Sequence, residues 1–195
     1  MNETIANDLR KSSKQFKDII IPELIKIFSD SQYEIVEGVT IEEFAKMLDT
    51  LAGIDVWQIE KNRGIRGIAS RIQPSDYNHK TFTVRKERES GASTEYEKRK
   101  FAIENDYLYP YFTLQAYLTK DGKLLDFACA KTTDVMDMID KGLCYVNGTN
   151  EDKIGQATFF VVDWDEMIKN GYQIYIHSKK IIVKKEKQTS LYEWM

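Results

Sequence analysis

Residues 53–100 read GIDVWQIEKNRGIRGIASRIQPSDYNHKTFTVRKERESGASTEYEKRK. In this stretch, four charged or polar side chains lie within segments that otherwise have the composition of buried strands: Asp55, Arg71, Gln73 and Arg85. A charge inside an apolar strand costs free energy unless it is paired or used by the protein. The stretch is therefore the first place to look for a functional site.

The composition indicates a folded protein of ordinary charge. The chain has 195 residues, of which 42% are hydrophobic, and its formal net charge is −3. This hydrophobic content is too high for a disordered chain. The charge argues against a strongly basic nucleic-acid coat protein, and it is too small for a protein that imitates DNA by charge alone. We expect a single domain over residues 1–195, with an N-terminal helical segment at about 3–29.

The cysteines and the apolar runs exclude several classes of protein. The two cysteines, Cys129 and Cys144, belong to no CxxC or Cys/His pattern of the kind that binds zinc. Cys129 lies in an apolar run and is expected to be a buried free thiol. The sequence shows no signal peptide and no apolar run of membrane length, so we expect a cytoplasmic protein with no membrane partner.

Helix signals dominate the first quarter of the chain. Within the N-terminal helical segment, Pro22 is expected to break, kink or restart the helix. Thr40 and Glu43 have the spacing of a capping box and predict a second helix, which Gly53 would end.

Strand signals follow in series, and short turns between successive strands imply antiparallel pairing with helices packed on the sheet. This is the α+β class, with a mixed-sheet α/β arrangement as the alternative. Residues 146–155, rich in Asn and Gly, are expected to form a loop, and 163–169 a helical turn. The expected strands are 54–59, 65–73, 81–86, 112–118, 124–130, 158–162, 173–177 and 180–183, and the expected later helices are 94–104 and a short one from 133.

Side chains alternate across a strand, so Arg71 and Gln73 project from the same face. That face also carries Gly67 and Ala69, whose small side chains would leave room for a ligand. If the first two strands of this stretch form a hairpin, Asp55 lies close to Arg71 or Gln73. The structural alternatives are an Asp55–Arg71 ion pair and a solvated sheet face.

A basic strand end comes next. Arg85, Lys86 and Arg88 precede a Ser-Gly-Ala-Ser loop and the start of a helix, an arrangement that suits an anion such as phosphate. With Arg71, they are the residues expected to bind substrate. An exposed hairpin end is the alternative. On the helix, Glu95 and Lys98 are three residues apart and share a face that would point toward the strands, although such residues commonly form solvated ion pairs.

The order helix, three strands, helix, strand over residues 40–118 resembles the core of the PD-(D/E)xK nuclease superfamily. Gly53-Ile54-Asp55 looks like its metal-binding aspartate at a strand start. The resemblance implies a restriction-endonuclease-like core in which carboxylates hold Mg²⁺ for cleavage of DNA or RNA. Asp55 would be a metal ligand, and Glu43 would supplement it.

The sequence departs from the family pattern on the next strand. Arg71-Ile72-Gln73 falls where the superfamily carries its second acid and its lysine, and it has neither. Gln73 is counted with the expected catalytic residues because of this position. Glu95 and Lys98 would supply the relocated acid and lysine, so that Asp55 and Glu95 hold the metal. Without that relocation, the chain would be a degenerate nuclease fold that binds without cutting.

Two functions from different classes therefore remain open. The first is a metal-dependent nuclease or a nuclease-fold protein that binds nucleic acid. The second is a non-enzymatic protein of phage or mobile-element type that binds and inhibits a larger protein partner, using the aromatic run 107–112 and the apolar tail 191–195. An enzyme acting on a small phosphorylated substrate is a third. The sequence does not indicate an oligomeric state.

Overall fold

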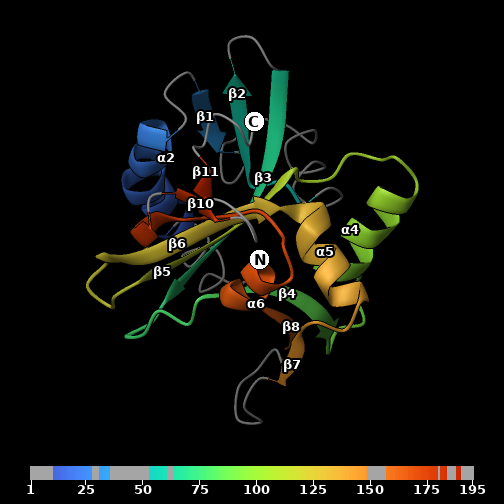
Figure 1. Ribbon diagram of the computed structural model, residues 1–195. Helices are drawn as coiled ribbons and strands as arrows, with labels where there is room; N and C mark the ends of the chain where they lie inside the picture. The colour runs from blue at the N-terminus through green and yellow to red at the C-terminus, as the bar shows by residue number, and fades with distance from the viewer. Residues whose placement is uncertain are drawn as a thin grey trace.

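The computed structural model describes residues 11–27, 31–35, 53–60, 64–148, 157–179, 181–183 and 188–189. Within these ranges the fold is α+β, as expected, with a large mixed sheet, a small antiparallel sheet and helices packed against them (Figure 1). The expected helix at 40–52, with Glu43, and the apolar tail at 191–195 lie outside the described residues.

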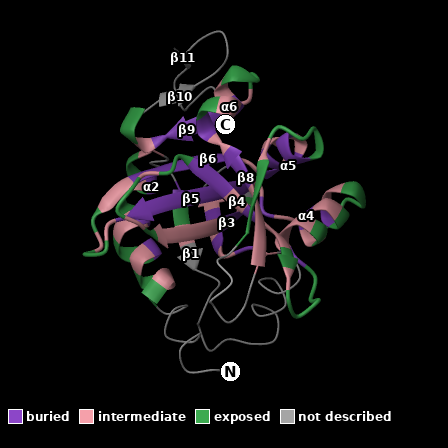
Figure 2. Ribbon diagram, turned by 90° about the horizontal axis from the view of Figure 1, so that it is seen from below, coloured by how far each residue is buried: buried purple, intermediate pink, exposed green. Residues whose placement is uncertain are grey.

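The large sheet forms the centre of the molecule, and Figure 2 shows its strands β5 and β6 as mostly buried. All neighbouring strands in it are antiparallel except β3 and β5, which run parallel. In spatial order the described strands are β1 (Ser31–Ile35), β2 (Val56–Glu60), β3 (Gly64–Pro74), β5 (Phe112–Leu118), β6 (Leu124–Lys131), β9 (Ile174–Ile176), β10 (Ile181–Val183) and β11 (Gln188–Thr189).

The small sheet corrects one expectation about pairing. It consists of β4 (Thr81–Arg88), β8 (Ala157–Asp163) and β7 (Tyr145–Gly148), with β8 in the middle. The short turn after β3 does not make β3 and β4 antiparallel partners, because β4 leaves the large sheet and pairs with β8. Phe82 and Val84 of β4 are fully buried in a second hydrophobic core. The large sheet alone would not form this core. Residues 146–148, expected in a loop, form part of β7.

The helices begin where the sequence signals place them. The N-terminal segment is helical from residue 11 and contains a π-helical turn, η1 (Phe16–Ile20), after which α2 (Ile21–Ile27) begins one residue before Pro22. The helical residues therefore run without a break through Pro22, and the proline follows a π-helical turn instead of ending the helix. The others are α4 (Glu95–Glu104), α5 (Thr132–Asp140) and α6 (Trp164–Lys169). No described helix has the length and apolar character needed to cross a membrane.

Two hydrophobic cores lie on opposite faces of the large sheet. Leu114 and Ala116 of β5 pack toward η1 and α2, whereas Tyr117 packs with β4, α5 and α6. On this second face β5 also carries Thr113 and Gln115, which are buried. Buried polar residues of a central strand need hydrogen-bond partners. Thr83 of β4 provides one, because its Oγ1 lies 3.0 Å from Oε1 of Gln115. The space between the large sheet and the small sheet is therefore polar near Thr83 and Gln115.

Candidate functional site

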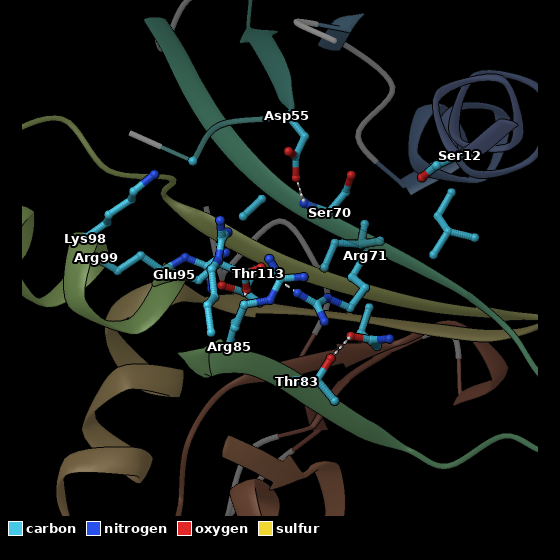
Figure 3. A pocket seen from close by; sticks show the side chains of 16 residues that line it. Ser12, Asp55, Ser70, Arg71, Thr83, Arg85, Glu95, Lys98, Arg99 and Thr113 are labelled. Atoms are coloured by element: carbon cyan, nitrogen blue, oxygen red, sulfur yellow. Dashed lines mark hydrogen bonds and ion pairs between the residues drawn. The ribbon is translucent and has the colours of Figure 1, made fainter. Parts of the chain in front are cut away.

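A cavity of about 350 Å³ opens where β3 and β5 of the large sheet face β4 and α4 (Figure 3). Among the described residues, five cationic side chains and two carboxylates line it, an excess of three positive charges. The uncharged part of the lining comes mainly from β3, β5 and the N-terminal helix. The charged lining residues are Asp55, Arg71, Arg85, Arg88, Glu95, Lys98 and Arg99.

A β-bulge places two arginines of β4 on the cavity side. Arg85 and Arg88 are three residues apart, so a regular strand would point them to opposite faces. The pairing of β4 with β8 shifts register between Arg85 and Glu87, which inserts one extra residue, Lys86. A bulge of this kind reverses the alternation beyond it. Arg85 and Arg88 consequently both line the cavity.

Helix α4 contributes a charged face at helical spacing. Glu95, Lys98 and Arg99 occupy positions i, i+3 and i+4, so they project from the same side. The expected capping box fixes the start of the helix: Thr94 accepts the backbone N–H of Glu97, and the Glu97 carboxylate accepts the backbone N–H of Thr94. The first turn is thereby fixed over the end of β4, and all three side chains reach the cavity.

Glu95 is the anionic centre of this cluster. Its carboxylate accepts a hydrogen bond from Nη2 of Arg71 at 2.5 Å and another from the backbone N–H of Arg85 at 3.3 Å. Burial raises the pKa of Glu95, but the positive charges of Arg71, Arg99 and Arg85 outweigh it, and the pKa is lowered overall. Glu95 is therefore ionised at neutral pH. The ion pair that the structure shows for Arg71 is with Glu95, whereas an Asp55–Arg71 pair was one of the alternatives from the sequence.

The aromatic ring of Phe159, which belongs to the small sheet, lies against two arginines of the cavity. The guanidinium carbons of Arg71 and Arg85 lie 4.9 and 5.6 Å from the ring centre of Phe159 in β8. Contacts of this type hold a guanidinium group flat over the ring face. Arg71 and Arg85 are thus fixed in position before any ligand arrives.

Several donors in the cavity have no acceptor within the described part of the chain. They are Nε of Arg85, Nε of Arg88, and Nε and Nη1 of Arg99. Arg99 is the most enclosed, with 7% of its surface exposed. Burial lowers the pKa of Arg99, while Glu95 and Asp55 offset part of that effect, and a guanidinium stays charged under such conditions. Buried donors without acceptors are uncommon in folded proteins, and an ion, water or ligand that supplies the acceptor is one explanation for them.

Comparison with known proteins does not indicate a function for this cavity. Comparison with protein-family models, curated proteins and solved structures finds no match to this chain. The residues of the cavity themselves are therefore the basis for assigning a function.

Asp55 lies at the rim of the cavity and holds the backbone of β3. Strand β2 pairs with β3 only as far as Ile68, whose carbonyl accepts the backbone N–H of Asp55 at 3.0 Å. Beyond that point the Asp55 carboxylate accepts the N–H of Ser70 at 2.5 Å (Figure 3). The Asp55 carboxylate thus accepts the hydrogen bond that a backbone carbonyl would accept if the pairing of β2 with β3 continued.

This contact predicts a stability effect at Asp55. The Asp55→Ala variant leaves the Ser70 N–H without its acceptor, and we expect unfolding to become easier by about 1 to 3 kcal/mol. The Asp55→Asn variant keeps an acceptor oxygen and should recover at least half of that loss. Urea unfolding of the three proteins measures both changes. If alanine and asparagine destabilise equally, the carboxylate charge matters rather than the hydrogen bond.

The described residues do not fit a magnesium site. The expected ligands Asp55 and Glu95 both line the cavity, but Glu95 is held by two arginine donors and Asp55 by the Ser70 amide. Mg²⁺ needs several oxygen ligands, which are commonly carboxylates and water. Within the ranges described, no group of three His, Cys, Asp or Glu side chains could hold a metal ion. The carboxylates of this cavity therefore serve its hydrogen bonds and ion pairs.

The structure brings together six of the residues singled out from the sequence and leaves two aside. Gln73 lies further along β3, where its amide oxygen is 3.5 Å from Nε2 of Gln115. Lys86 is the bulged residue of β4, with its Nζ 3.2 Å from Glu87 and 5.7 Å from the Phe160 ring centre. Neither is among the lining residues. The six that converge are Asp55, Arg71, Arg85, Arg88, Glu95 and Lys98.

Sequence reasoning missed Arg99, the most buried cation of the cavity. It lies four residues after Glu95, and the helical spacing that joined Glu95 to Lys98 predicts its position equally well. A run of charges on a helix is usually solvated, so the sequence alone gives Arg99 no distinction from its neighbours. The polar lining residues Thr113 and Gln115 carry no comparable signal, because they lie in a strand with an apolar composition.

Proposed function

We propose that this chain is a nucleic-acid-binding protein with a nuclease-like core, whose arginine cavity holds phosphate groups. The observation that carries the proposal is Arg99, a buried guanidinium with two donor nitrogens that lack acceptors among the described residues, in a cavity of positive excess charge. Guanidinium groups match phosphate oxygens in geometry and charge. Phosphate contacts of this kind supply most of the sequence-independent affinity for nucleic acid.

The proposal favours binding over cleavage. In a metal-dependent nuclease, the carboxylates would be kept available for Mg²⁺, but here Glu95 is paired with Arg71. The alternative, a protein that binds and inhibits a larger protein, draws on a different surface. Phe101, Tyr107 and Leu108 are more than half exposed near the end of α4, and the Phe101 and Tyr107 ring centres are 5.6 Å apart. That function leaves the arginine cavity without a role, so phosphate binding is preferred.

The test is binding of a fluorescent single-stranded oligonucleotide in EDTA. We expect the Arg85→Gln/Arg88→Gln double variant to lose at least about tenfold in affinity, because two phosphate donors are removed. The dependence of log affinity on log salt should become shallower by about one unit or more. The matched control is Lys120→Gln/Lys123→Gln, which removes two cations that are each 80% exposed at the β5–β6 turn.

Three outcomes would contradict the proposal. The first is no binding even at low salt. The second is an equal loss in the control pair, which would mean that net charge alone is responsible. The third is cleavage of the oligonucleotide that requires Mg²⁺ and disappears in Asp55→Asn, which would restore the nuclease hypothesis.

A further inference from the structure

Three cations of the cavity lie together. Figure 3 shows Lys98, Arg99 and Arg85 on one side, while Ser12 of the N-terminal helical segment lies on the opposite side beyond Arg71. The lining also contains uncharged polar residues, among them Ser12, Thr113 and Gln115. A ligand that fits the cationic side therefore carries a strongly anionic group.

We propose that the cationic side of the cavity takes a phosphomonoester, with its phosphate at Arg85, Arg88 and Arg99. Such a group occurs on a nucleoside monophosphate and on the phosphorylated end of a strand. The inference rests on the proposed function, because it names the part of a nucleic acid that the same cavity recognises. An internal phosphodiester of a strand would make fewer of the same contacts, so a strand would bind best at its phosphorylated end.

Charge favours a phosphomonoester over a phosphodiester. A phosphodiester carries one negative charge, whereas a phosphomonoester carries about 1.5 to 2 at neutral pH and has three terminal oxygens. Three positive charges in the cavity remain after Asp55 and Glu95 are counted. The four donor nitrogens without acceptors in the described part of the chain come from three arginines on two elements, β4 and α4. Several terminal oxygens can accept from these donors, whereas a phosphodiester has only two free oxygens.

The size of the cavity also favours a strand end. Its volume of about 350 Å³ lies at the lower limit of small-ligand pockets, which begin at about 300 Å³. One nucleotide fills such a space, and a length of strand does not. Arg71 is already held by Glu95 and Phe159, so it forms part of the fixed wall of this space.

The test compares oligonucleotides of one sequence that carry a 5′-phosphate, a 3′-phosphate or only hydroxyl ends. Fluorescence anisotropy in EDTA at fixed salt measures each affinity. We expect one phosphorylated end to bind at least about tenfold more tightly than the hydroxyl form. Inorganic phosphate and a nucleoside monophosphate should compete for that advantage. In Arg99→Met both forms should bind more weakly, and the phosphorylated form should lose more, so that its advantage disappears.

The outcomes separate this inference from the proposed function. Equal affinity for all three oligonucleotides would overturn end recognition and leave nucleic-acid binding standing. Binding of the nucleoside monophosphate without binding of any oligonucleotide would support the phosphomonoester site and overturn the proposed function. Absence of binding by phosphate, nucleotide and oligonucleotides alike would overturn both.

Discussion

Replacing Glu95 with glutamine is expected to destabilise the free protein and strengthen its binding of phosphate. Glu95 balances Arg71, Arg85 and Arg99, so its loss leaves guanidinium groups close together without an anion. We expect a loss of about 2 to 3 kcal/mol, less than the roughly 3 to 5 kcal/mol of a fully buried pair, because the cavity admits water. Affinity for a phosphorylated oligonucleotide should rise about tenfold as the positive excess grows by one.

The pH dependence of stability gives a second readout for Glu95. Its pKa is lowered in the folded protein, so the unfolded chain binds more protons in the acid range. The stabilising contribution is therefore complete above the unfolded pKa of about 4.3 and is lost as the pH falls through the folded pKa. We expect the stability difference between the two proteins to be constant from about pH 6 to 8 and to shrink below about pH 4.

A control on the same helix separates this effect from general charge removal. Glu104→Gln removes an exposed carboxylate whose nearest cation, Lys100, is 4.0 Å away, and its stability should change by no more than about 0.5 kcal/mol. Denaturant unfolding and anisotropy titrations measure both variants. The interpretation of the cavity fails if Glu95→Gln is as stable as the unaltered protein and binds phosphate no better.

Replacing Arg99 with methionine is expected to weaken phosphate binding and to change the stability of the free protein little. Methionine has a similar length and no charge, so it fills the buried space without a donor. Binding of the phosphorylated oligonucleotide should weaken by about 10- to 100-fold, the value of one or two charge-assisted hydrogen bonds. The free energy of unfolding should fall by no more than about 1 kcal/mol, because two unpaired buried donors are removed together with the attraction to Glu95.

The neighbouring residue provides the matched control for this prediction. Lys100 is also on α4, but its Nζ contacts Asp140 at 3.1 Å and it does not line the cavity. Lys100→Met removes one positive charge from the same helix turn and should leave phosphate affinity within about twofold. If Arg99→Met mainly lowers stability and leaves affinity unchanged, Arg99 has a structural role and not a binding one.

Most elements of the fold followed from local signals. Strand composition and the turns between the strands predicted β3 and β5 closely, and the Thr94–Glu97 capping box predicted the start of α4. These signals depend on residues near in sequence, which is why they can be read without a structure. The parallel pairing of β3 with β5 was not predicted, because it joins strands separated by β4 and α4.

The sequence singled out several residues that the structure brings together, but it did not indicate the partners of the two carboxylates. The sequence pointed to Asp55, Glu95 and Lys98 as a converging group, and all three line one cavity. A metal role was expected because the resemblance to the PD-(D/E)xK nuclease superfamily implies carboxylates that hold Mg²⁺. The structure instead uses the Asp55 carboxylate on the Ser70 amide and the Glu95 carboxylate on Arg71. Such partners come from other strands, so no local pattern predicts them.

The amino-acid sequence by itself determined the α+β class, the limits of most strands and helices, and the stretch that carries the charged side chains. Only the tertiary structure decided which charges pair and which lack acceptors among the described residues. The bulge in β4 turned Arg88 to the side of Arg85, and the crossing of α4 over that strand enclosed Arg99. The physical reason is that pairing and burial depend on distances between segments far apart along the chain, whereas strand and helix signals are local.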